Sequence, residues 1–310
     1  MAVTLGDPRG IGPEIVAAAR SDAQCSTLAE LVLVGPSGTE VSVDHSIGEW
    51  ASGGDAAQRA ATAGRLAGLA IEHAVRLAQS GDVAGIVTAP IDKAALYAGG
   101  YDYPGHTEML AALTGSTVAM MLASSASADG GTHPLRVVLA TTHIALRDVP
   151  SAVTADAIAN AVRVTREGLV DWFGVESPRI ALCALNPHAG DGGRFGTEDD
   201  TILAPAARRA GIAGPFPADT VFVRALRGEF DAVIAPYHDV GMTAMKVAAF
   251  GRAVNVTLGL PFPRTSPDHG TAIDIAGRGM ADASSMKESV RVCAVIARRL
   301  IASRSRAATA

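Results

Sequence analysis

Short apolar runs alternate with amphipathic stretches along most of the chain. The apolar runs have the length of buried strands, and they lie at 2–5, 31–35, 83–90, 135–143, 179–187, 232–238 and 254–261. The longer amphipathic or Ala- and Leu-rich stretches predict helices at 13–20, 56–80, 154–173 and 284–303. Strand and helix in repetition predict an α/β fold, with a mostly parallel sheet and helices on its faces.

The composition is typical of a globular α/β enzyme. Of the 310 residues, 48% are hydrophobic and 18% are charged, which excludes the composition of a disordered chain. The net charge of −5 argues against nucleic-acid binding, and no apolar run reaches the roughly 18 residues of a membrane span. The N-terminus has no signal-peptide pattern, so we expect the cytoplasm. Cys25, Cys183 and Cys293 are expected to be free, buried thiols.

Three histidines stand where predicted strands end, namely His143, His188 and His238. In open α/β sheets, ligands bind beyond the carboxyl ends of the strands. If the three strands are neighbours, the imidazoles can converge and hold a divalent metal such as Zn²⁺ with one position left open. From the residues alone, three hydrogen-bonded structural histidines explain the pattern equally well.

A second group of polar residues suits an anionic ligand. His106 and Thr107, in the motif GHTE, follow a Pro-Gly turn and predict a helix N-terminus, whose free N–H groups favour phosphate or carboxylate. Lys246, Asn255 and Arg264 add cationic and polar groups, and arginine can bind an anion through two hydrogen bonds. A simple N-cap and ordinary surface charge are the alternatives.

Two glycine-rich segments are candidates for a nucleotide site. The turn GDPRGIGPE at 6–14 follows a strand and precedes a helix, but Ile15 stands where the dinucleotide fingerprint has its third glycine. The loop DHGTAIDIAGRGMAD at 268–282 is the better candidate, because His269 can stack on a purine and its glycines permit close backbone approach. A plain loop that joins a strand to a helix has the same composition.

Eight segments of the chain resemble motifs of the 4-hydroxythreonine-4-phosphate dehydrogenase family of vitamin B6 biosynthesis, and they occur in the same order as in that family. They are GDPRGIGPEI, TAPIDKAAL, PGHTEML, TTHIALRDV, LNPHAGDGGRFGTED, PADTVF, YHDVGM and VNVTLGLPFPRTSPDHGTAIDIAG. HGTAIDIAGRG is also similar to the adenine-side loop of the isocitrate and isopropylmalate dehydrogenase fold. Together the segments span nearly the whole chain.

The resemblance implies an isocitrate/isopropylmalate dehydrogenase-like α/β fold of two α/β/α subdomains around a central cleft. The subdomains comprise approximately 1–110 plus 255–310, and 111–254, and they form a single catalytic unit over 1–310. The implied cofactor is NAD, with NADP as the alternative. The implied partners are a small phosphorylated substrate and a second copy of the chain, in a homodimer with a shared active site and without nucleic acid or membrane.

The resemblance also implies roles for individual residues. The implied metal ligands are His143, His188 and His238, contributed across the dimer interface to one divalent ion per site, with Zn²⁺ first and Mn²⁺, Mg²⁺ or Co²⁺ as alternatives. The implied substrate-binding residues are His106, Thr107, Lys246, Asn255 and Arg264, and the cofactor-binding residues are His269, Gly270 and Asp274. Either Asp239 or Lys93 is the expected general base, and the sequence does not choose between them.

The implied reaction is oxidation of the secondary alcohol of 4-phosphohydroxy-L-threonine to a 3-oxo acid, followed by decarboxylation. Val240 departs from the family pattern, because YHDVG stands where the family has YHDQG. The segment between Gly35 and Asp55 is also short for the family. These departures keep two alternative substrate classes open, which are 4-phospho-D-threonate or erythronate and, more distantly, a carboxylated dihydrodiol.

Overall fold

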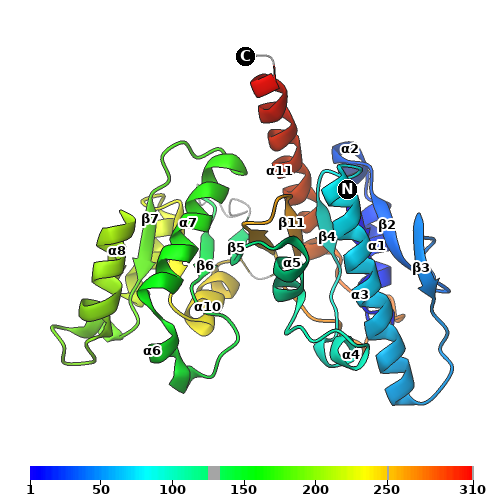
Figure 1. The fold of residues 1–310 in the computed structure, drawn as a ribbon, viewed down its shortest axis with the longest axis horizontal. Coiled ribbons are helices and arrows are strands. Elements are labelled where there is room, and N and C mark those ends of the chain that lie inside the picture. The colour runs from blue at the N-terminus through cyan, green and yellow to red at the C-terminus, as the bar shows by residue number, and fades with distance from the viewer. Residues whose placement is uncertain (125–132, 250, 309–310) are drawn as a thin grey trace. The chain divides into compact units, whose positions relative to one another are not determined.

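The structure is a computed structural model that describes residues 1–124, 133–249 and 251–308. It divides into two compact units, one formed by Met1–Ser116 with Leu260–Ala310 and the other by Thr117–Gly259. Each unit contains its own run of neighbouring strands with helices packed against them (Figure 1). The predicted α/β class is therefore confirmed. The Ala- and Ser-rich composition of ASSASADGGTH at 123–133 is typical of a surface loop, but 125–132 lie outside the described residues, and Ala123 and Ser124 belong to the strand β5.

The first unit has strands in the order β3-β2-β1-β4-β11, and each neighbouring pair is parallel. Their bounds are β1 Ala2–Thr4, β2 Val32–Ser37, β3 His45–Glu49, β4 Ile86–Thr88 and β11 Arg264–Pro267. Strands β1, β4 and β11 are buried along their whole length. That burial explains why the sequence shows β1 and β4 as unbroken apolar runs, without alternation.

Among the described residues, six helices belong to the first unit. They are α1 Gly12–Arg20, α2 Ala23–Leu28, α3 Ala56–Ser80, α4 Lys93–Ala98, α5 His106–Thr114 and α11 Ser284–Ala308. Helix α3 begins at a capping box between Asp55 and Gln58, and it ends at Gly81, whose φ of 85° suits a residue without a Cβ. The apolar spacing and these end signals explain why the sequence predicts α3 with its bounds.

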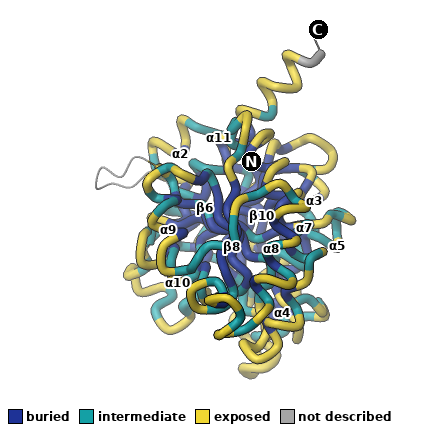
Figure 2. Tube along the Cα trace, turned by 90° about the vertical axis from the view of Figure 1, so that its left-hand side faces the viewer, coloured by how far each residue is buried: buried dark blue, intermediate teal, exposed yellow. Residues whose placement is uncertain are grey.

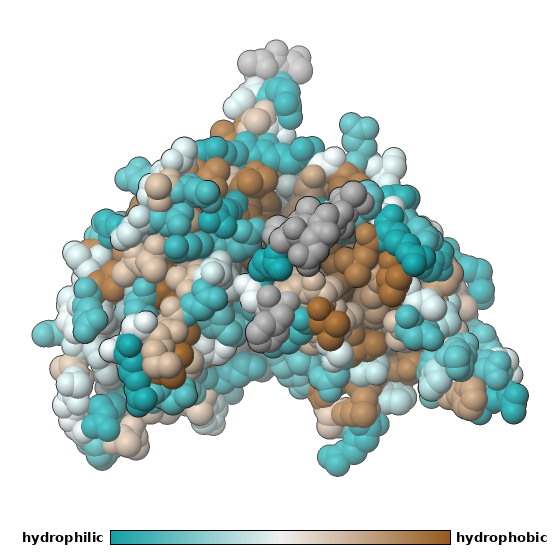
Figure 3. All heavy atoms as spheres, turned by 180° about the vertical axis from the view of Figure 1, so that it is seen from behind, coloured by the Kyte–Doolittle hydropathy of each residue, from teal (hydrophilic) through white to brown (hydrophobic). Residues whose placement is uncertain are grey.

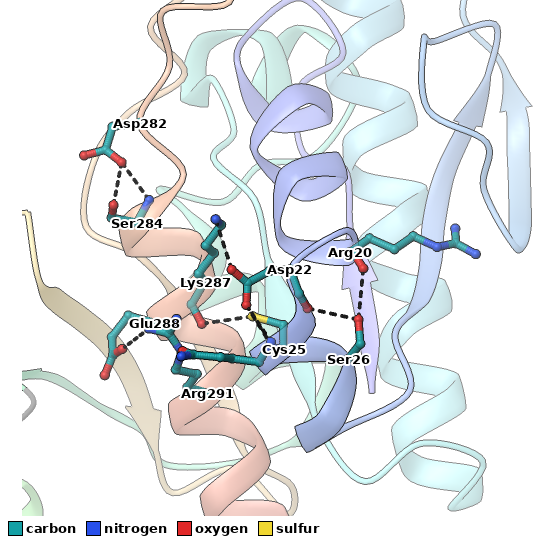
Figure 4. Close-up of polar contacts among 10 residues, drawn as sticks. Arg20, Asp22, Cys25, Ser26, Asp282, Ser284, Lys287, Glu288 and Arg291 are labelled. Carbon is teal, nitrogen blue, oxygen red and sulfur yellow. Dashed lines mark hydrogen bonds and ion pairs between the residues drawn. The ribbon is translucent and has the colours of Figure 1, made fainter.

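A polar cluster joins α2 to the start of α11 (Figure 4). Asp22 caps α2 by accepting the N–H groups of Gln24 and Cys25, and its other oxygen lies 3.1 Å from Lys287 Nζ. The backbone hydrogen bond from Cys25, followed by the hydrogen bond from Lys287, lowers the pKa of Asp22 to about 2. Cys25 itself is buried, and burial raises the pKa of its thiol to about 11. The cluster is a structural link, and its cysteine is unreactive.

The second unit has strands in the order β10-β5-β6-β9-β7-β8. Their bounds are β5 Ala119–Ser124, β6 Arg136–Leu139, β7 Ile180–Cys183, β8 Ala213–Phe216, β9 Ala232–Ala235 and β10 Ala253–Leu258. Strand β5 is antiparallel to both β10 and β6, whereas β6, β9, β7 and β8 are mutually parallel. The carboxyl ends of β6, β9 and β7 therefore lie at one edge, and those are the strands that precede the three histidines.

The helices of the second unit pack beside this sheet. They are α6 Val149–Ala152, α7 Ala155–Asp171, α8 Ala204–Ala210, α9 Ala218–Leu226 and α10 His238–Ala249, with 3₁₀ turns η1 Leu146–Asp148 and η2 Pro187–Gly190 and a π turn η3 Asp199–Leu203. Thr154 caps α7 by accepting the Ala157 N–H.

The cores consist mainly of Val, Leu, Ile and Ala side chains on these strands and helices. Strands β6 and β10 are mostly buried and dark blue in Figure 2, whereas the exposed end of α11 is mostly yellow. The face drawn in Figure 3 mixes hydrophilic atoms with separate hydrophobic patches. All three cysteines are buried and free, as the sequence predicts. In the described part of the chain, no helix is long and apolar enough to cross a membrane.

Candidate active site

Two of the three predicted histidines lie together in the second unit. His143 follows β6 and His238 follows β9, and their ring centroids are 5.5 Å apart. They line one pocket, whose walls are Thr142, His143, Ile144, Leu146, Val149, Tyr237, His238 and Asp239. The pairing of β6 with β9 brings the two imidazoles into one place.

A carboxylate orients the second of these rings. Asp239 Oδ1 lies 2.7 Å from His238 Nδ1. Because a carboxylate only accepts, this contact makes Nδ1 the protonated nitrogen and leaves the lone pair on Nε2. Metal-bound histidines commonly have such a carboxylate on their other nitrogen. His238 therefore has the chemistry of a metal ligand, and Asp239 has that of the group that orients it.

His188 lies on a left-handed turn after β7. From His188 to Gly193 six consecutive residues have positive φ, and three of them, His188, Ala189 and Asp191, are not glycine, with φ of 53°, 55° and 45°. Each such residue costs about 1 kcal/mol or more relative to right-handed backbone. Strain of this kind is concentrated at functional sites. The His188 ring centroid is 6.4 Å from that of Phe195.

The described residues contain no group of three or more His, Cys, Asp or Glu side chains that could hold a metal ion. One chain thus brings His143 and His238 together, and His188 is not part of a three-ligand group with them. Since the resemblance implies ligands from two chains, the full set of three remains a prediction.

A buried arginine marks the predicted anion site in the first unit. Arg264 begins β11 and is only 1% exposed. Its Nη2 donates to Thr88 Oγ1 at 2.5 Å, across the neighbouring strands β11 and β4. Burial lowers the pKa of Arg264 to about 9, because the charged guanidinium is removed from water. An anion bound at Arg264 would stabilise this charge.

His106 lies close to the same charge. Helix α5 begins at His106, as the sequence predicts. Its Nε2 is buried and has no hydrogen-bond partner among the described residues. Burial, and then the positive charges of Arg264 and Lys93, lower the pKa of His106 well below its usual range. A neutral imidazole with an unsatisfied nitrogen beside two cations is suited to an anionic group that has a proton to share or donate.

Lys93 is held at this place by a network that the sequence analysis did not find. Arg9 makes two hydrogen bonds to the buried Asp7, at 3.0 and 2.7 Å, and a third to Asp92 at 3.2 Å. Asp92 in turn caps α4, whose first residue is Lys93. The network thus links the turn after β1 to the turn after β4, and the Lys93 Cε atom lies against Gly105, directly before α5.

The predicted cofactor loop has an unsatisfied nitrogen of its own. His269 Nδ1 lies 3.1 Å from the Gly270 carbonyl, whereas its Nε2 is buried without a partner among the described residues. Gly270 faces open space and Asp274 is exposed. The unsatisfied Nε2 and the open glycine fit a ligand that approaches this backbone closely.

The loop at 268–282 packs against the turn at 6–14, which lacks the third glycine of the dinucleotide fingerprint. Ile11 N donates to the Thr271 carbonyl at 2.9 Å, and Gly277 N donates to Glu14 Oε1 at 3.2 Å. Between them and the β2–β3 connection lies a groove of about 440 Å³, lined by Pro8, Arg9, Gly10, Pro13, Glu14, Ala17, Gly38, Thr39, Glu40, Val41, Trp50, Ala276 and Gly277. The two glycine-rich segments, far apart in sequence, thus line one groove.

The remaining predicted residues lie in the second unit. Asn255 is in the middle of β10, opposite Leu122 of β5, and its Oδ1 is buried without a partner among the described residues. Lys246 is exposed on α10, the helix that begins at His238. Val240, which departs from the family pattern, packs against the apolar core of this unit. Thr107 is the second residue of α5 in the first unit.

Supporting residues were missed because their own sequence signals are weak. Thr88 and Asp7 are buried polar residues at or just after strand ends, and Trp50 lies in the loop after β3. The polar strand ends carried a signal, since the same position at a strand end indicates the three histidines. Nothing in the sequence pattern indicated that Arg9 would pair with residues on two different turns.

A pair of histidines away from these groups joins β3 to α3. His73 Nε2 and His45 Nδ1 are 3.1 Å apart, and Arg76 Nη2 lies 3.4 Å from His73 Nδ1. Burial, followed by His45 and Arg76, lowers the pKa of His73. His73 and His106 therefore share a preference for the neutral form in the folded protein.

We expect the free energy of unfolding to decrease as the pH falls below about 6.5, the ordinary pKa of histidine. Both histidines have a lower pKa in the folded protein than in the unfolded chain. Below that pH the unfolded chain therefore binds more protons, which stabilises it relative to the folded protein. Above it their contribution is fully present. Urea unfolding at pH 7.5 and 5.5 measures the change, which should be smaller in His73→Gln and His106→Gln. Equal pH dependence in all three proteins would contradict the assignment.

Comparison with known proteins tests the family. The family model described as pyridoxal phosphate biosynthetic protein PdxA matches residues 15–293. A 4-hydroxythreonine-4-phosphate dehydrogenase from Beijerinckia indica is 43% identical over 93% of this chain and 92% of its own. A relative from Bradyrhizobium diazoefficiens, provisionally named D-threonate 4-phosphate dehydrogenase, is 39% identical over 98% and 99%.

Solved structures agree with this comparison. The crystal structure of 4-hydroxythreonine-4-phosphate dehydrogenase from Klebsiella pneumoniae has a TM-score of 0.81 and 38% identity, and the match covers 96% of this chain and 97% of the other. A β-decarboxylating dehydrogenase from Thermococcus kodakarensis, at 14% identity and a TM-score of 0.51 over 93% and 80% of the two chains, shares the fold alone. The family predicted from the motifs is confirmed, and the chain belongs to the dehydrogenase family of pyridoxal phosphate biosynthetic protein PdxA.

Proposed function

We propose that this protein oxidises the secondary alcohol of a 4-phosphorylated hydroxy acid, with 4-phosphohydroxy-L-threonine as the substrate, and that the 3-oxo acid then loses CO₂. The observation that carries the proposal is the buried Arg264 beside His106 and Lys93. A buried cation with lowered pKa, next to a neutral imidazole and a second cation, is a site for a phosphate group. The names of the relatives support the same substrate class.

The histidine pair supports metal dependence. His143 and His238 would hold a divalent ion, and His188 would complete the set across the interface of a homodimer. When bound, such an ion acts as a Lewis acid that lowers the pKa of the substrate hydroxyl and stabilises the negative charge after decarboxylation. Exposed apolar side chains support an interface here, because Ile144 and Leu146 line the histidine pocket and Phe195 follows the His188 turn.

The chain's own groups divide the remaining tasks. Arg264, with His106 and Thr107 at the start of α5, would bind the phosphate and thereby fix the reacting carbon. The hydroxyl proton would go to Asp239 or Lys93, of which Asp239 already accepts from His238 Nδ1 through one oxygen. Asn255 and Lys246 would add polar contacts to the substrate.

The cofactor would bind along the loop that contains His269, Gly270 and Asp274. The adjoining groove offers Trp50 as a stacking surface, and its carboxylates Glu14 and Glu40 disfavour a 2′-phosphate. Arg9 is the only cation among the described residues that line the groove, and it pairs with Asp7 and Asp92. This arrangement supports NAD over NADP.

Production of NADH with a series of candidate substrates tests the proposed function. We expect turnover with 4-phosphohydroxy-L-threonine in the presence of Zn²⁺, Mn²⁺, Mg²⁺ or Co²⁺, and less than about one tenth of that rate with NADP. Fluorescence of a Trp172→Phe variant, whose single tryptophan is Trp50, measures cofactor binding separately from turnover. Absence of turnover with every phosphorylated substrate would overturn the proposal.

The second candidate is a catabolic dehydrogenase of 4-phospho-D-threonate or erythronate. The provisional name of the Bradyrhizobium relative and the departure at Val240 favour it. The same experiment separates the two functions, because the substrate with the highest kcat/KM identifies the physiological class. A preference for an unphosphorylated dihydrodiol carboxylate would contradict both.

A further inference from the structure

The strained turn that carries His188 is held in place by a buried carboxylate. We propose that Asp199 is a positioning residue that fixes this turn so that His188 can bind the metal ion. The inference rests on the proposed metal dependence, and it concerns a residue that has no role in the assignments above. Asp199 is 1% exposed, and no ion pair within the described residues compensates its charge.

The two carboxylate oxygens are both used on the chain that leads to His188. Oδ1 accepts the Leu185 N–H at 2.8 Å, and Oδ2 accepts the Asn186 N–H at 2.9 Å. These are the residues between the end of β7 and the turn η2. A buried carboxylate that receives two backbone N–H groups fixes the direction of that backbone, because each bond is charge-assisted.

Neighbouring side chains reinforce the same segment. Asn186 Nδ2 donates to Glu198 Oε2 at 2.9 Å. The backbone N–H of Glu198, followed by this hydrogen bond from Asn186, lowers the pKa of the Glu198 carboxyl. Asp199 also begins the π turn η3, an irregularity that is frequent at functional sites. Glu198 and Asp199 thus accept hydrogen bonds from Leu185 and Asn186, which lie shortly before His188.

The turn itself needs such support. A left-handed series of i→i+3 hydrogen bonds runs through it, from Ala189 N to Asn186 O, from Asp191 N to His188 O and from Gly193 N to Gly190 O. Its non-glycine members disfavour this conformation, so local hydrogen bonds alone leave it poorly determined. A loop required only for packing could use glycine at these positions. Here His188 itself has a strained backbone, and the buried Asp199 carboxylate holds the residues before it. This combination indicates that the His188 ring is required in one exact position.

The test is a double-mutant cycle with Asp199→Asn and Ala189→Gly. In Asp199→Asn, one N–H acceptor becomes an NH₂ group that faces a donor, so the backbone before His188 loses its fixed direction. Ala189→Gly removes strain from the turn. Asp200→Asn is the matched control, because it makes the same change of charge at the exposed neighbour.

We expect Asp199→Asn to weaken equilibrium binding of Zn²⁺ about tenfold or more, a typical effect of residues that support metal ligands. It should lower kcat and leave the KM of the phosphorylated substrate unchanged. Asp200→Asn should match the wild type in both. Adding Ala189→Gly should recover part of the Zn²⁺ affinity, since less support is needed for an unstrained turn.

Each alternative result has a distinct meaning. A lower melting temperature of Asp199→Asn with unchanged Zn²⁺ affinity and kcat would show a purely structural residue and overturn the inference. If the single variant does not fold, the double variant is compared with Ala189→Gly alone, and equal Zn²⁺ affinity there would also overturn it. A wild-type protein that oxidises the substrate without bound metal would overturn the inference and the metal part of the proposed function together.

Discussion

Replacing Arg264 by methionine should lower kcat/KM for the phosphorylated substrate by roughly 100-fold, with most of the effect in KM. The loss corresponds to about 3 kcal/mol, which is two charge-assisted hydrogen bonds at the lower end of their usual range. Arg264 is buried and its charge is removed from water, so its hydrogen bonds to a bound phosphate would be stronger than those of an exposed cation. Steady-state kinetics with varied substrate concentration measures the effect.

Stability provides the control for this prediction. An apolar side chain of similar length in place of a buried charge is commonly neutral or stabilising. Arg264→Met should therefore unfold at the same temperature as the wild type or higher, which separates binding from folding. Thr88→Val, which removes the acceptor of the 2.5 Å hydrogen bond, should weaken kcat/KM about tenfold. An unchanged KM in Arg264→Met would show that the phosphate binds elsewhere.

Replacing His238 by alanine should reduce kcat by about 1,000-fold and remove most of the bound metal. The size of the effect follows from the several kcal/mol that a Lewis acid contributes to stabilising an alkoxide. His238 is singled out because its Nε2 lone pair is set by the hydrogen bond between Nδ1 and Asp239. Metal content of the purified protein and single-turnover rates measure the two effects independently.

Two further variants help to interpret the result for His238→Ala. Asp239→Asn keeps the ligand but weakens its orientation, so a loss of 10- to 100-fold in metal affinity is expected. His133→Ala is the matched control, since His133 is an exposed histidine of the same unit outside the pocket. Full metal occupancy in His238→Ala would exclude His238 as a ligand.

Much of the candidate site was predictable because its residues follow strong local patterns. His143, His188 and His238 stand at the ends of short apolar runs whose length predicts strands, and such strand ends are where α/β sheets bind ligands. The start of α5 at His106 was also local, since a Pro-Gly turn precedes an apolar stretch. The residues that support them were not predictable, because the contacts of Thr88 with Arg264 and of Asp199 with Leu185 join distant parts of the sequence.

Several strands were missed for a related reason. Strand β11, with the sequence RTSP, and strand β3, with HSIGE, have no apolar run, and β8 contains glycine and proline. Their extended form depends on hydrogen bonds to β4, β2 and β7, and those partners are distant or separated by a helix in sequence. Predicted strands were also too long at their ends, because buried apolar residues continue into the turns.

The sequence by itself determined the α/β class, the main helices, and the residue types placed at the strand ends, because periodicity and end signals are local properties. Only the tertiary structure decided that β6, β9 and β7 are neighbours, that Arg264 is desolvated, and that His188 lies in a left-handed turn. The physical reason is that burial, strand order and backbone strain depend on groups that meet only when the chain folds. Local sequence patterns carry no information on those contacts.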